Sequence, residues 1–313
     1  MNDLIIIGAG PCGITASIFA ARKKMDFLLI TEDIGGQALL TNSVENYTGF
    51  TILTGPELVA KFKEQLDLNN IAVKTGETII SIVQEDGLFK VKTSKAEYVS
   101  RSVIISSGRQ HAKLGVMGES RFVNKGVAYC ATCDAPVYGG KDVVVIGGGN
   151  SALDAVLQLS KYARQVYVIN RGSAFRADPI LIDKVSSAKN VTVYHNASVQ
   201  EIAGNEFVER VMIQQQCCTT IVLPVQGVFI EIGTSASSDF ISFVNKNAHG
   251  EIMIDCSCAT NIPGLFAAGD VTTVSAKQII IACGEGAKAA VSAYKYVLQN
   301  KTNRSKADIS PVV

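Results

Sequence analysis

Short apolar runs and longer helical stretches alternate along the chain. Residues 4–7 are four consecutive aliphatic side chains, followed by a glycine-rich turn at 8–13 and a helical stretch that reaches Arg22. A second apolar run occupies residues 27–30. This order of strand, glycine turn, helix and strand is typical of a βαβ unit with parallel strands.

The same pattern starts again near the middle of the chain. The apolar run 143–146 precedes a glycine turn at 147–152, a helical stretch to about Tyr162 and another strand at 165–169. The two copies predict an α/β fold class, with two Rossmann-like, three-layer nucleotide-binding domains.

The remaining pattern is less regular. Residues 79–84 and 89–93 flank Asp86-Gly87 and predict an antiparallel hairpin, while 103–108 is a short buried strand that ends on a glycine. A further apolar strand at 264–270 is followed by a predicted helix over about 277–300. We expect a loosely held tail at 301–313, and domain crossings near 111–116 and 239–246.

Length and charge restrict the class of protein. The chain has 313 residues, which favours two domains, and Lys plus Arg number 29 against 28 Asp plus Glu, so no net charge points to nucleic acid or a membrane surface. The first residues run directly into an apolar strand without a basic leader, so we expect a cytoplasmic protein. In that compartment the eight cysteines are interpreted as thiols, redox pairs or metal ligands.

The first glycine turn has the GxGxxG spacing of a dinucleotide-binding motif. Gly8 permits the tight turn, Gly10 lets a pyrophosphate approach the backbone, and Gly13 lets helix and strand pack closely. The helix that starts at Pro11 supplies free N–H groups for the phosphates. An acidic residue is expected about twenty positions later for the ribose hydroxyls, and Glu32 fits.

The second turn carries Ala at its third glycine position, which is an accepted variant. Two such motifs in one chain predict two dinucleotides. The candidate binding residues of this turn are Gly147, Gly149, Asn150, Ser151 and Ala152. After the following strand stand Asn170, Arg171 and Arg176; two arginines without a carboxylate favour the 2′-phosphate of NADPH over NADH.

Cys130 and Cys133 form a CxxC motif, which indicates either a redox dithiol or half of a metal site. A carboxylic acid follows at once: Asp134 could protonate a thiolate that leaves when a disulfide is cleaved. A zinc site needs further ligands, and the only close second group is Cys256 with Cys258. The histidines at 111, 195 and 249 show no ligand spacing, so we predict no metal site.

The other cysteines are interpreted mostly as buried thiols. Cys12 lies inside the first motif, where a small residue packs, and Cys283 lies in an apolar helical run. Cys217 and Cys218 are expected in a strand, and the Cys256/Cys258 spacing leaves a second redox centre as an alternative.

Taken together, these motifs resemble the low-molecular-weight thioredoxin reductases over essentially the whole chain. The matching segments, in the family's order, are 35–37, 45–47, 130–134, 147–152 and 267–270. Segments 277–279 and 284–286 are especially similar to the flavoprotein component of alkyl hydroperoxide reductase, which carries an additional N-terminal thioredoxin-like module.

The resemblance implies a discontinuous FAD domain at 1–113 and 245–313, with an NAD(P) domain that carries the redox disulfide inserted at 114–244. It also implies a homodimer. In addition to the first glycine motif and Glu32, the resemblance implies the following FAD-binding residues: Gly36, Gln37, Asn46, Gly108, Gly269, Asp270, Lys277, Gln278 and Ile279.

The implied activity is transfer of electrons from NADPH through FAD to the Cys130–Cys133 disulfide, and on to an external thioredoxin or thioredoxin-like protein. Cys133 would face the flavin step, Cys130 would attack the partner, and one domain would rotate against the other between steps.

One departure leaves the electron donor open. The family's phosphate motif, His-Arg-Arg with another arginine four residues on, is half missing here, and the acid of the NADH-linked relatives is absent too. The alternatives are an NADH- or ferredoxin-dependent reductase, a reductase of a glutaredoxin-like or peroxiredoxin-system carrier, and a flavin-binding redox sensor without turnover.

Overall fold

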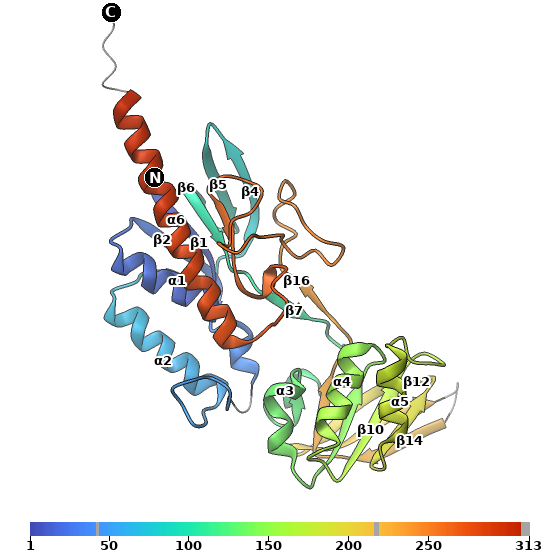
Figure 1. Cartoon of the computed structure of the whole chain (residues 1–313). Coiled ribbons are helices and arrows are strands. Elements are labelled where there is room, and N and C mark those ends of the chain that lie inside the picture. The colour runs from blue at the N-terminus through green and yellow to red at the C-terminus, as the bar shows by residue number, and fades with distance from the viewer. Residues whose placement is uncertain (42–43, 216–218, 308–313) are drawn as a thin grey trace, which may run out of the picture. The chain divides into compact units, whose positions relative to one another are not determined.

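The computed structural model describes residues 1–41, 44–215 and 219–307, and the chain divides into two units. The first unit comprises Met1–Leu39, Pro56–Gln110 and the chain from Ser235 onward; the second comprises Leu40–Gly55 and His111–Thr234. Figure 1 shows both units, and each is described separately below.

The first unit is built on a seven-stranded sheet with the first apolar run at its centre. Strand β1 pairs in parallel with β2 and β6, and β17 extends the parallel part beside the carboxyl half of β6. The order is β3-β2-β1-β6-β5-β4, with β17 on β6. The strands are β1 (Asn2–Ala9), β2 (Phe27–Ile34), β3 (Val73–Lys74), β4 (Ile79–Glu85), β5 (Leu88–Thr93), β6 (Glu97–Ile105) and β17 (Leu265–Ala267).

The predicted hairpin is confirmed as β4 and β5, which pair antiparallel. Its turn residues Asp86 and Gly87 have φ angles of 52° and 72°. Two consecutive positive φ angles match the right-handed twist of the flanking strands, which is why Asp-Gly is favoured at such a turn.

The α-helices described in the first unit are α1 (Pro11–Arg22), α2 (Gly55–Leu68) and α6 (Ile279–Ala307). Helices α1 and α6 lie side by side (Figure 1). The expected loose tail is wrong for 301–307, where α6 continues, because the segment from Lys301 to Pro311 has no glycine, and no proline before Pro311, to end the helix. The rest of the tail, 308–313, lies outside the described residues.

The second unit has a five-stranded sheet in which every pairing is parallel, in the order β11-β10-β9-β15-β8. Its strands are β8 (Val127–Ala128), β9 (Asp142–Ile146), β10 (Gln165–Asn170), β11 (Val191–His195) and β15 (Gly227–Ile230). Both faces of this sheet are covered, which explains why the run 143–146 is apolar throughout rather than alternating.

Alternate side chains of this sheet enter two different cores. Val143 and Val145 pack against helices, and Val144 and Ile146 pack against a three-stranded antiparallel sheet. The covering elements are α3 (Ala131–Asp134), α4 (Asn150–Leu159), α5 (Pro179–Ser187), β12 (Ala197–Gly204), β13 (Val208–Gln215) and β14 (Thr219–Pro224). This three-layer arrangement confirms the predicted α/β fold class.

The chain enters and leaves the second unit for the short segment Leu40–Gly55, and its two main crossings lie at 110/111 and 234/235, where β7 (Arg109–His111) pairs with β16 (Thr234–Ala236). The second crossing was predicted later in the chain, at 239–246. That stretch belongs to the first unit because Ile241 and Val244 pack in its core with Ile5 and Ile7. No helix of the described residues is both long and apolar enough to cross a bilayer.

Candidate functional site

The first glycine turn has the geometry that a dinucleotide requires. Gly8 has a φ of +94°, and a Cβ on Gly13 would overlap the carbonyl oxygen of Gly8, so helix α1 packs directly on the turn. A Cβ on Gly10, by contrast, would meet no atom of the described residues within 4 Å. The turn therefore combines close helix packing with an open face at its second glycine, which suits a pyrophosphate.

The start of α1 is also suited to an anion. Gly10 precedes the helix and Pro11 is its first residue; among the described residues, no side chain caps this end and no acid stands in its first turn. No acid of the helix's own first turn therefore opposes the free N–H groups. Glu32 lies exposed near the carboxyl end of β2, inside the strand, because β2 continues past the predicted run 27–30 to Ile34.

The predicted residues at 36 and 37 lie near this turn. A Cβ on Gly36 would come within 3.3 Å of Gly10 Cα, and Gln37 Nε2 donates to the carbonyl of Arg109. Asn46, predicted for the same cofactor, lies in the segment Leu40–Gly55, which falls in the second unit. The structure therefore does not group Asn46 with the other candidate FAD residues.

A charged cluster stands beside Asp270. Lys277 Nζ lies 3.2 Å from Glu251 Oε1, and Arg109 Nη1 pairs with the same oxygen. Burial raises the pKa of Asp270, while Lys277 and Arg109 act in the opposite direction. For Glu251, burial also acts to raise the pKa, but hydrogen bonds from Asn247 and Lys277 prevail and hold it below its usual value.

Arg109 and Glu251 were not predicted. Arg109 directly follows the predicted residue Gly108, so it could have been predicted as a site residue from its position in the sequence. Glu251 is more than one hundred residues away from Arg109 in sequence, and no local pattern marks it.

The other candidate FAD residues are distributed around the same unit. Gly108 has a φ of +69°, and its carbonyl accepts from Ser237 N at 3.0 Å. A Cβ on Gly269 would lie 3.0 Å from Cys12 Cβ, and Gln278 immediately precedes Ile279, the first residue of α6. The open turn, the uncapped helix start and the cluster around Asp270 together fit a flavin dinucleotide.

The second glycine turn has the same design. A Cβ on Gly147 would overlap the carbonyl oxygen of Glu231, whereas one on Gly149 would meet no described atom within 4 Å. Ala152 is fully buried, and no acid stands in the first turn of α4 as described. Asn150 Nδ2 donates to Asp178 Oδ2 at 3.0 Å, and Ser151 is exposed. This turn also fits a dinucleotide.

Asn170 organises the loop after β10. Its buried amide nitrogen lies 3.1 Å from Gly172 O, 2.9 Å from Ala174 O and 3.0 Å from His195 Nδ1. The backbone N–H of Arg176 donates to Gly148 O at 2.7 Å, which ties the loop to the glycine turn. The side chains of Arg171 and Arg176 are exposed. Sequence reasoning noted Asn170 only as the absence of an acid and missed its role in holding the loop.

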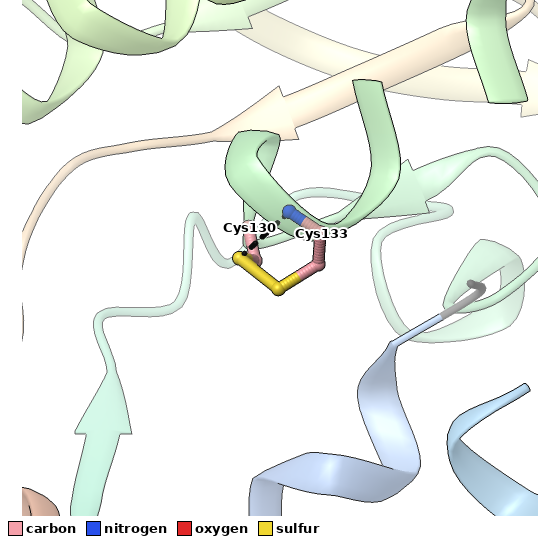
Figure 2. The surroundings of a disulfide bond; sticks show 2 residues. All are labelled: Cys130 and Cys133. Atoms are coloured by element: carbon pink, nitrogen blue, oxygen red, sulfur yellow. Dashed lines mark hydrogen bonds between the residues drawn. A yellow bond between two sulfur atoms is a disulfide. The ribbon is translucent and has the colours of Figure 1, made fainter. Parts of the chain in front are cut away.

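Cys130 and Cys133 are joined by a disulfide, with their Cα atoms 5.4 Å apart (Figure 2). Cys130 precedes the single turn α3, and the Cys133 N–H donates to Cys130 Sγ at 3.3 Å. Asp134 is fully buried, and its N–H donates to Cys130 O at 3.1 Å. Burial, and then the negative charge of Asp134, raises the pKa of the Tyr138 hydroxyl.

The disulfide and the nucleotide motif share one edge of the sheet. Cys130 follows β8, Gly147 follows β9, Arg171 follows β10 and Glu231 follows β15, and all these strands are parallel. Ligand sites of open α/β sheets lie at the carboxyl ends of the strands. Glu231 was not predicted; burial raises the pKa of its half-buried carboxyl group to about 7.

The remaining cysteines differ in exposure. Cys12, Cys258 and Cys283 are buried, whereas Cys256 is exposed. Cys258 Sγ lies 3.3 Å from Glu285 Oε2, and burial raises the pKa of this thiol to about 12. Cys217 and Cys218 lie outside the described residues. Within the described chain no three His, Cys, Asp or Glu side chains are arranged to hold a metal ion.

Comparison with known proteins places these features in a wider group. Residues 2–286 match the family model described as pyridine nucleotide-disulphide oxidoreductase. The chain is 38% identical to the F subunit of alkyl hydroperoxide reductase from Escherichia coli (strain K12), over 96% of this chain and 59% of that protein. It is 37% identical to a protein named NADH dehydrogenase from Bacillus subtilis (strain 168), over 95% of this chain and 59% of that protein.

Among solved structures, thioredoxin reductase from Streptococcus pyogenes MGAS5005 superposes with a TM-score of 0.89 at 34% identity. That match covers 96% of this chain and 99% of the other. The chain therefore spans nearly the full length of that solved chain, but less than two thirds of the curated relatives that it matches.

Proposed function

The chain belongs to the pyridine nucleotide-disulphide oxidoreductase family, and we propose that it is an FAD-dependent disulfide reductase that passes electrons from NADPH to a thioredoxin-like protein. The observation that carries the proposal is the Cys130–Cys133 disulfide, which stands at the same sheet edge as the second glycine turn. A redox-active pair beside a nucleotide site supports electron transfer to an external disulfide.

We assign FAD to the first unit and the nicotinamide nucleotide to the second. The first unit offers the glycine turn at Gly8, the exposed carboxylate of Glu32 for ribose hydroxyls, and the cluster around Asp270. The FAD, when bound, would accept a hydride from the nicotinamide and supply two electrons for opening the disulfide. The assignment of these domains and residues rests on the family and on the fit of both turns.

The chain's own residues then manage protons and sulfur bonds. Opening the Cys130–Cys133 bond takes two electrons, and Asp134 supplies a proton to one sulfur. The Cys130 thiolate attacks the partner's disulfide, forms a mixed disulfide and releases one partner thiolate, which takes a proton. Cys133 then attacks Cys130, the internal disulfide forms again, and the second partner thiol leaves.

The preference for NADPH is supported by the loop after β10. Arg171 and Arg176 are exposed there, and the loop is fixed by Asn170 and by the bond from Arg176 N to Gly148 O. Guanidinium groups bind phosphate in a bidentate manner, while the neutral Asn170 offers no carboxylate to a 2′-hydroxyl. Both features favour a phosphorylated ribose.

A second candidate is an NADH-dependent reductase of a peroxiredoxin-system carrier. The observation that favours it is the 38% identity to the F subunit of an alkyl hydroperoxide reductase, with another relative named NADH dehydrogenase. A ferredoxin-dependent reductase is a third donor assignment. For each, a homodimer in the cytoplasm is the expected setting, by analogy with the family.

Anaerobic titration of the purified yellow protein with NADPH, and separately with NADH, tests the donor. We expect NADPH to bleach the visible absorption of the oxidised flavin rapidly, and NADH to do so at least about tenfold more slowly. Bleaching by NADH alone would move the protein to the second candidate. Bleaching by dithionite but by neither nucleotide would contradict both and favour ferredoxin.

Variants of the loop sharpen this test. Arg176→Ala should raise the NADPH concentration needed for half-maximal bleaching rate by about tenfold, because a charge-assisted phosphate contact is lost. The same variant should leave the response to NADH within about twofold. Arg210→Ala, which removes an exposed arginine from β13, is the matched control and should behave as the wild type.

A further inference from the structure

Two cations of the first unit share one carboxylate oxygen. Arg109 Nη1 pairs with Glu251 Oε1, and Lys277 Nζ lies 3.2 Å from the same oxygen. The side chains of Arg109, Lys277 and Glu251 are 14%, 25% and 15% exposed, so water and salt screen their charges only in part. The reaction proposed above gives no task to Arg109 or Glu251.

The carboxylate of Glu251 is held in place by Asn247. Asn247 Nδ2 donates to Glu251 Oε2 at 2.6 Å, and Asn247 Oδ1 accepts the backbone N–H of Glu251 at 3.0 Å. The backbone N–H of Asn247 donates to Glu251 O at 2.9 Å, which closes the turn between them. A carboxylate fixed in this way can hold a cation with little further loss of conformational freedom.

Hydrogen bonds join this charged cluster to the turn that carries Asp270, a candidate flavin residue. The residue after Glu251 donates its backbone N–H to Val271 O at 2.9 Å, and Lys277 Nζ donates to Thr272 O. The pKa of Asp270 agrees with this arrangement, because burial raises it and the two cations act to lower it. The cluster is therefore built onto the Asp270 turn.

Arg109 joins the cluster to a second candidate flavin segment. It directly follows Gly108, and its carbonyl oxygen accepts Gln37 Nε2. The ion pairs of Glu251 thus lie among residues that the sequence assigned to FAD, one of which is Lys277 itself.

We propose that Glu251 is a positioning residue of the flavin site, which holds the Arg109 and Lys277 cations where they stabilise the reduced form of bound FAD. The proposal rests on the assignment of FAD to the first unit. A hydride delivers two electrons and one proton, so its arrival adds one negative charge to the site. Fixed cations stabilise that charge and raise the reduction potential of the flavin, while Glu251 offsets part of their effect.

The test measures the reduction potential of bound FAD in the full-length protein, without nucleotide or partner protein. Xanthine oxidase with methyl viologen reduces the flavin slowly under anaerobic conditions, together with a reference dye of known potential, and absorbance follows both. The parent protein and all variants carry Cys133→Ser, so that the Cys130–Cys133 couple does not overlap the flavin signal. For a two-electron couple, a tenfold change in the reduction equilibrium corresponds to about 30 mV.

Arg109→Gln removes one cation and should lower the equilibrium constant for flavin reduction by about tenfold, or about 30 mV. Lys277→Gln should shift the constant in the same direction, because it removes the second cation on the same oxygen. Arg109→Lys keeps the charge and should remain within about twofold of the parent.

The variants of Glu251 separate its charge from its positioning role. Glu251→Gln removes the opposing charge but keeps an acceptor oxygen, so it should raise the constant by about threefold or more. Glu251→Ala removes the acceptor as well, so the cations are no longer held and the constant should fall below that of Glu251→Gln.

Arg101→Gln is the matched control, because it removes an arginine of the same unit that pairs with Asp3 at 3.5 Å. Its potential should stay within about twofold of the parent in equilibrium constant. The ratio of flavin to protein absorbance and the melting temperature confirm that each variant is folded and loaded.

A potential of Arg109→Gln equal to that of Arg101→Gln would overturn the proposal. Shifts of the same sign in Arg109→Gln and Glu251→Gln would overturn it too, since a structural disturbance would then account for both. Equal potentials in Glu251→Ala and Glu251→Gln would remove the positioning role. A wild-type protein that carries no flavin and takes up none from added FAD would instead contradict the FAD assignment itself, and the inference with it.

Discussion

The two glycine turns follow one plan but differ where the helix meets the strand. In the first unit, a Cβ on Gly13 would overlap the carbonyl oxygen of Gly8; in the second, Ala152 carries a Cβ at the equivalent position and is fully buried. Helix α1 therefore approaches its turn more closely than α4 approaches the turn at Gly147. The same motif tolerates a methyl group in one unit and excludes it in the other.

The units also differ at the end of their second strands. Glu32 is an exposed carboxylate on β2. Asn170, at the end of β10, is buried, and its side-chain amide donates hydrogen bonds to the loop that carries Arg171 and Arg176. One end offers an acceptor for hydroxyl groups and the other offers cations. The two strand ends thus differ in charge, which supports our proposal that the two units bind different dinucleotides.

Replacing Cys133 should have the largest effect, because it should stop disulfide reduction in the second unit without affecting flavin reduction in the first. Cys133→Ser removes one sulfur from the second unit and leaves the first untouched, so the rate of disulfide reduction in a bacterial thioredoxin should fall by at least about 10³-fold. Flavin bleaching by the nucleotide should change by less than about twofold, because it does not use the disulfide. Stopped-flow absorbance measures the bleaching, and nucleotide consumption in the presence of thioredoxin measures the turnover.

Cys256→Ser is the matched control, since it removes an exposed thiol outside the CxxC motif. Thioredoxin reduction that persists in Cys133→Ser would contradict the assignment of the redox centre. Turnover that is absent in the wild type as well, with bleaching intact, would favour the flavin redox sensor instead.

A pair of substitutions at the third motif position tests the packing difference directly. Gly13→Ala places a methyl group on the backbone of Gly8, and we expect it to cost about 3 kcal/mol of unfolding free energy and to reduce FAD retained on purification. Ala152→Gly removes a buried methyl near the start of α4 and should cost only about 1 kcal/mol. Urea unfolding and the ratio of flavin to protein absorbance measure both effects, and equal losses would refute the inferred difference in helix approach.

Much of the fold followed from local pattern. Both glycine turns, the Asp-Gly hairpin and the buried strands could be predicted because their signals lie within a few residues of one another. The second crossing was placed too late because the packing of Ile241 and Val244 with Ile5 depends on a strand more than two hundred residues earlier. The length of α6 was underestimated because polarity alone does not end a helix.

The candidate site was predictable where chemistry is local and not where it is assembled from distant strands. CxxC and the acid after it are contiguous in sequence, so Cys130, Cys133 and Asp134 could be named together. Glu231 and Glu251 could not: Glu231 comes to the sheet edge of the CxxC motif from β15, and Arg109, the ion-pair partner of Glu251, lies 142 residues earlier in the sequence. Asn170 was visible but was interpreted only by the charge it lacks.

The smallest predicted effect is the contribution of Glu251 to stability at different pH. Both ion pairs of Glu251 lie within the first unit. Because hydrogen bonds and the charges of Lys277 and Arg109 lower the pKa of Glu251, its ionised form stabilises the folded state. That contribution is fully present above the unfolded-state pKa of about 4.3 and is lost as pH falls through the folded value. Glu251→Gln should therefore cost about 1–2 kcal/mol at pH 7, and the difference from the wild type should shrink as pH falls below about 4.

Thermal unfolding followed by circular dichroism between pH 3 and 7 measures this dependence. Glu64→Gln, at an exposed ion pair with Lys61, is the matched control and should change stability by less than about 0.5 kcal/mol at every pH. A constant difference between Glu251→Gln and the wild type down to pH 3 would show that the Glu251 charge does not stabilise the first unit. In the second unit the expected sign is reversed: burial raises the pKa of Glu231 to about 7, so stability is lost as pH rises from the unfolded-state value of about 4.3 to about 7 and stays constant above that. Glu231→Gln should accordingly gain stability relative to the wild type above neutral pH, opposite to Glu251→Gln.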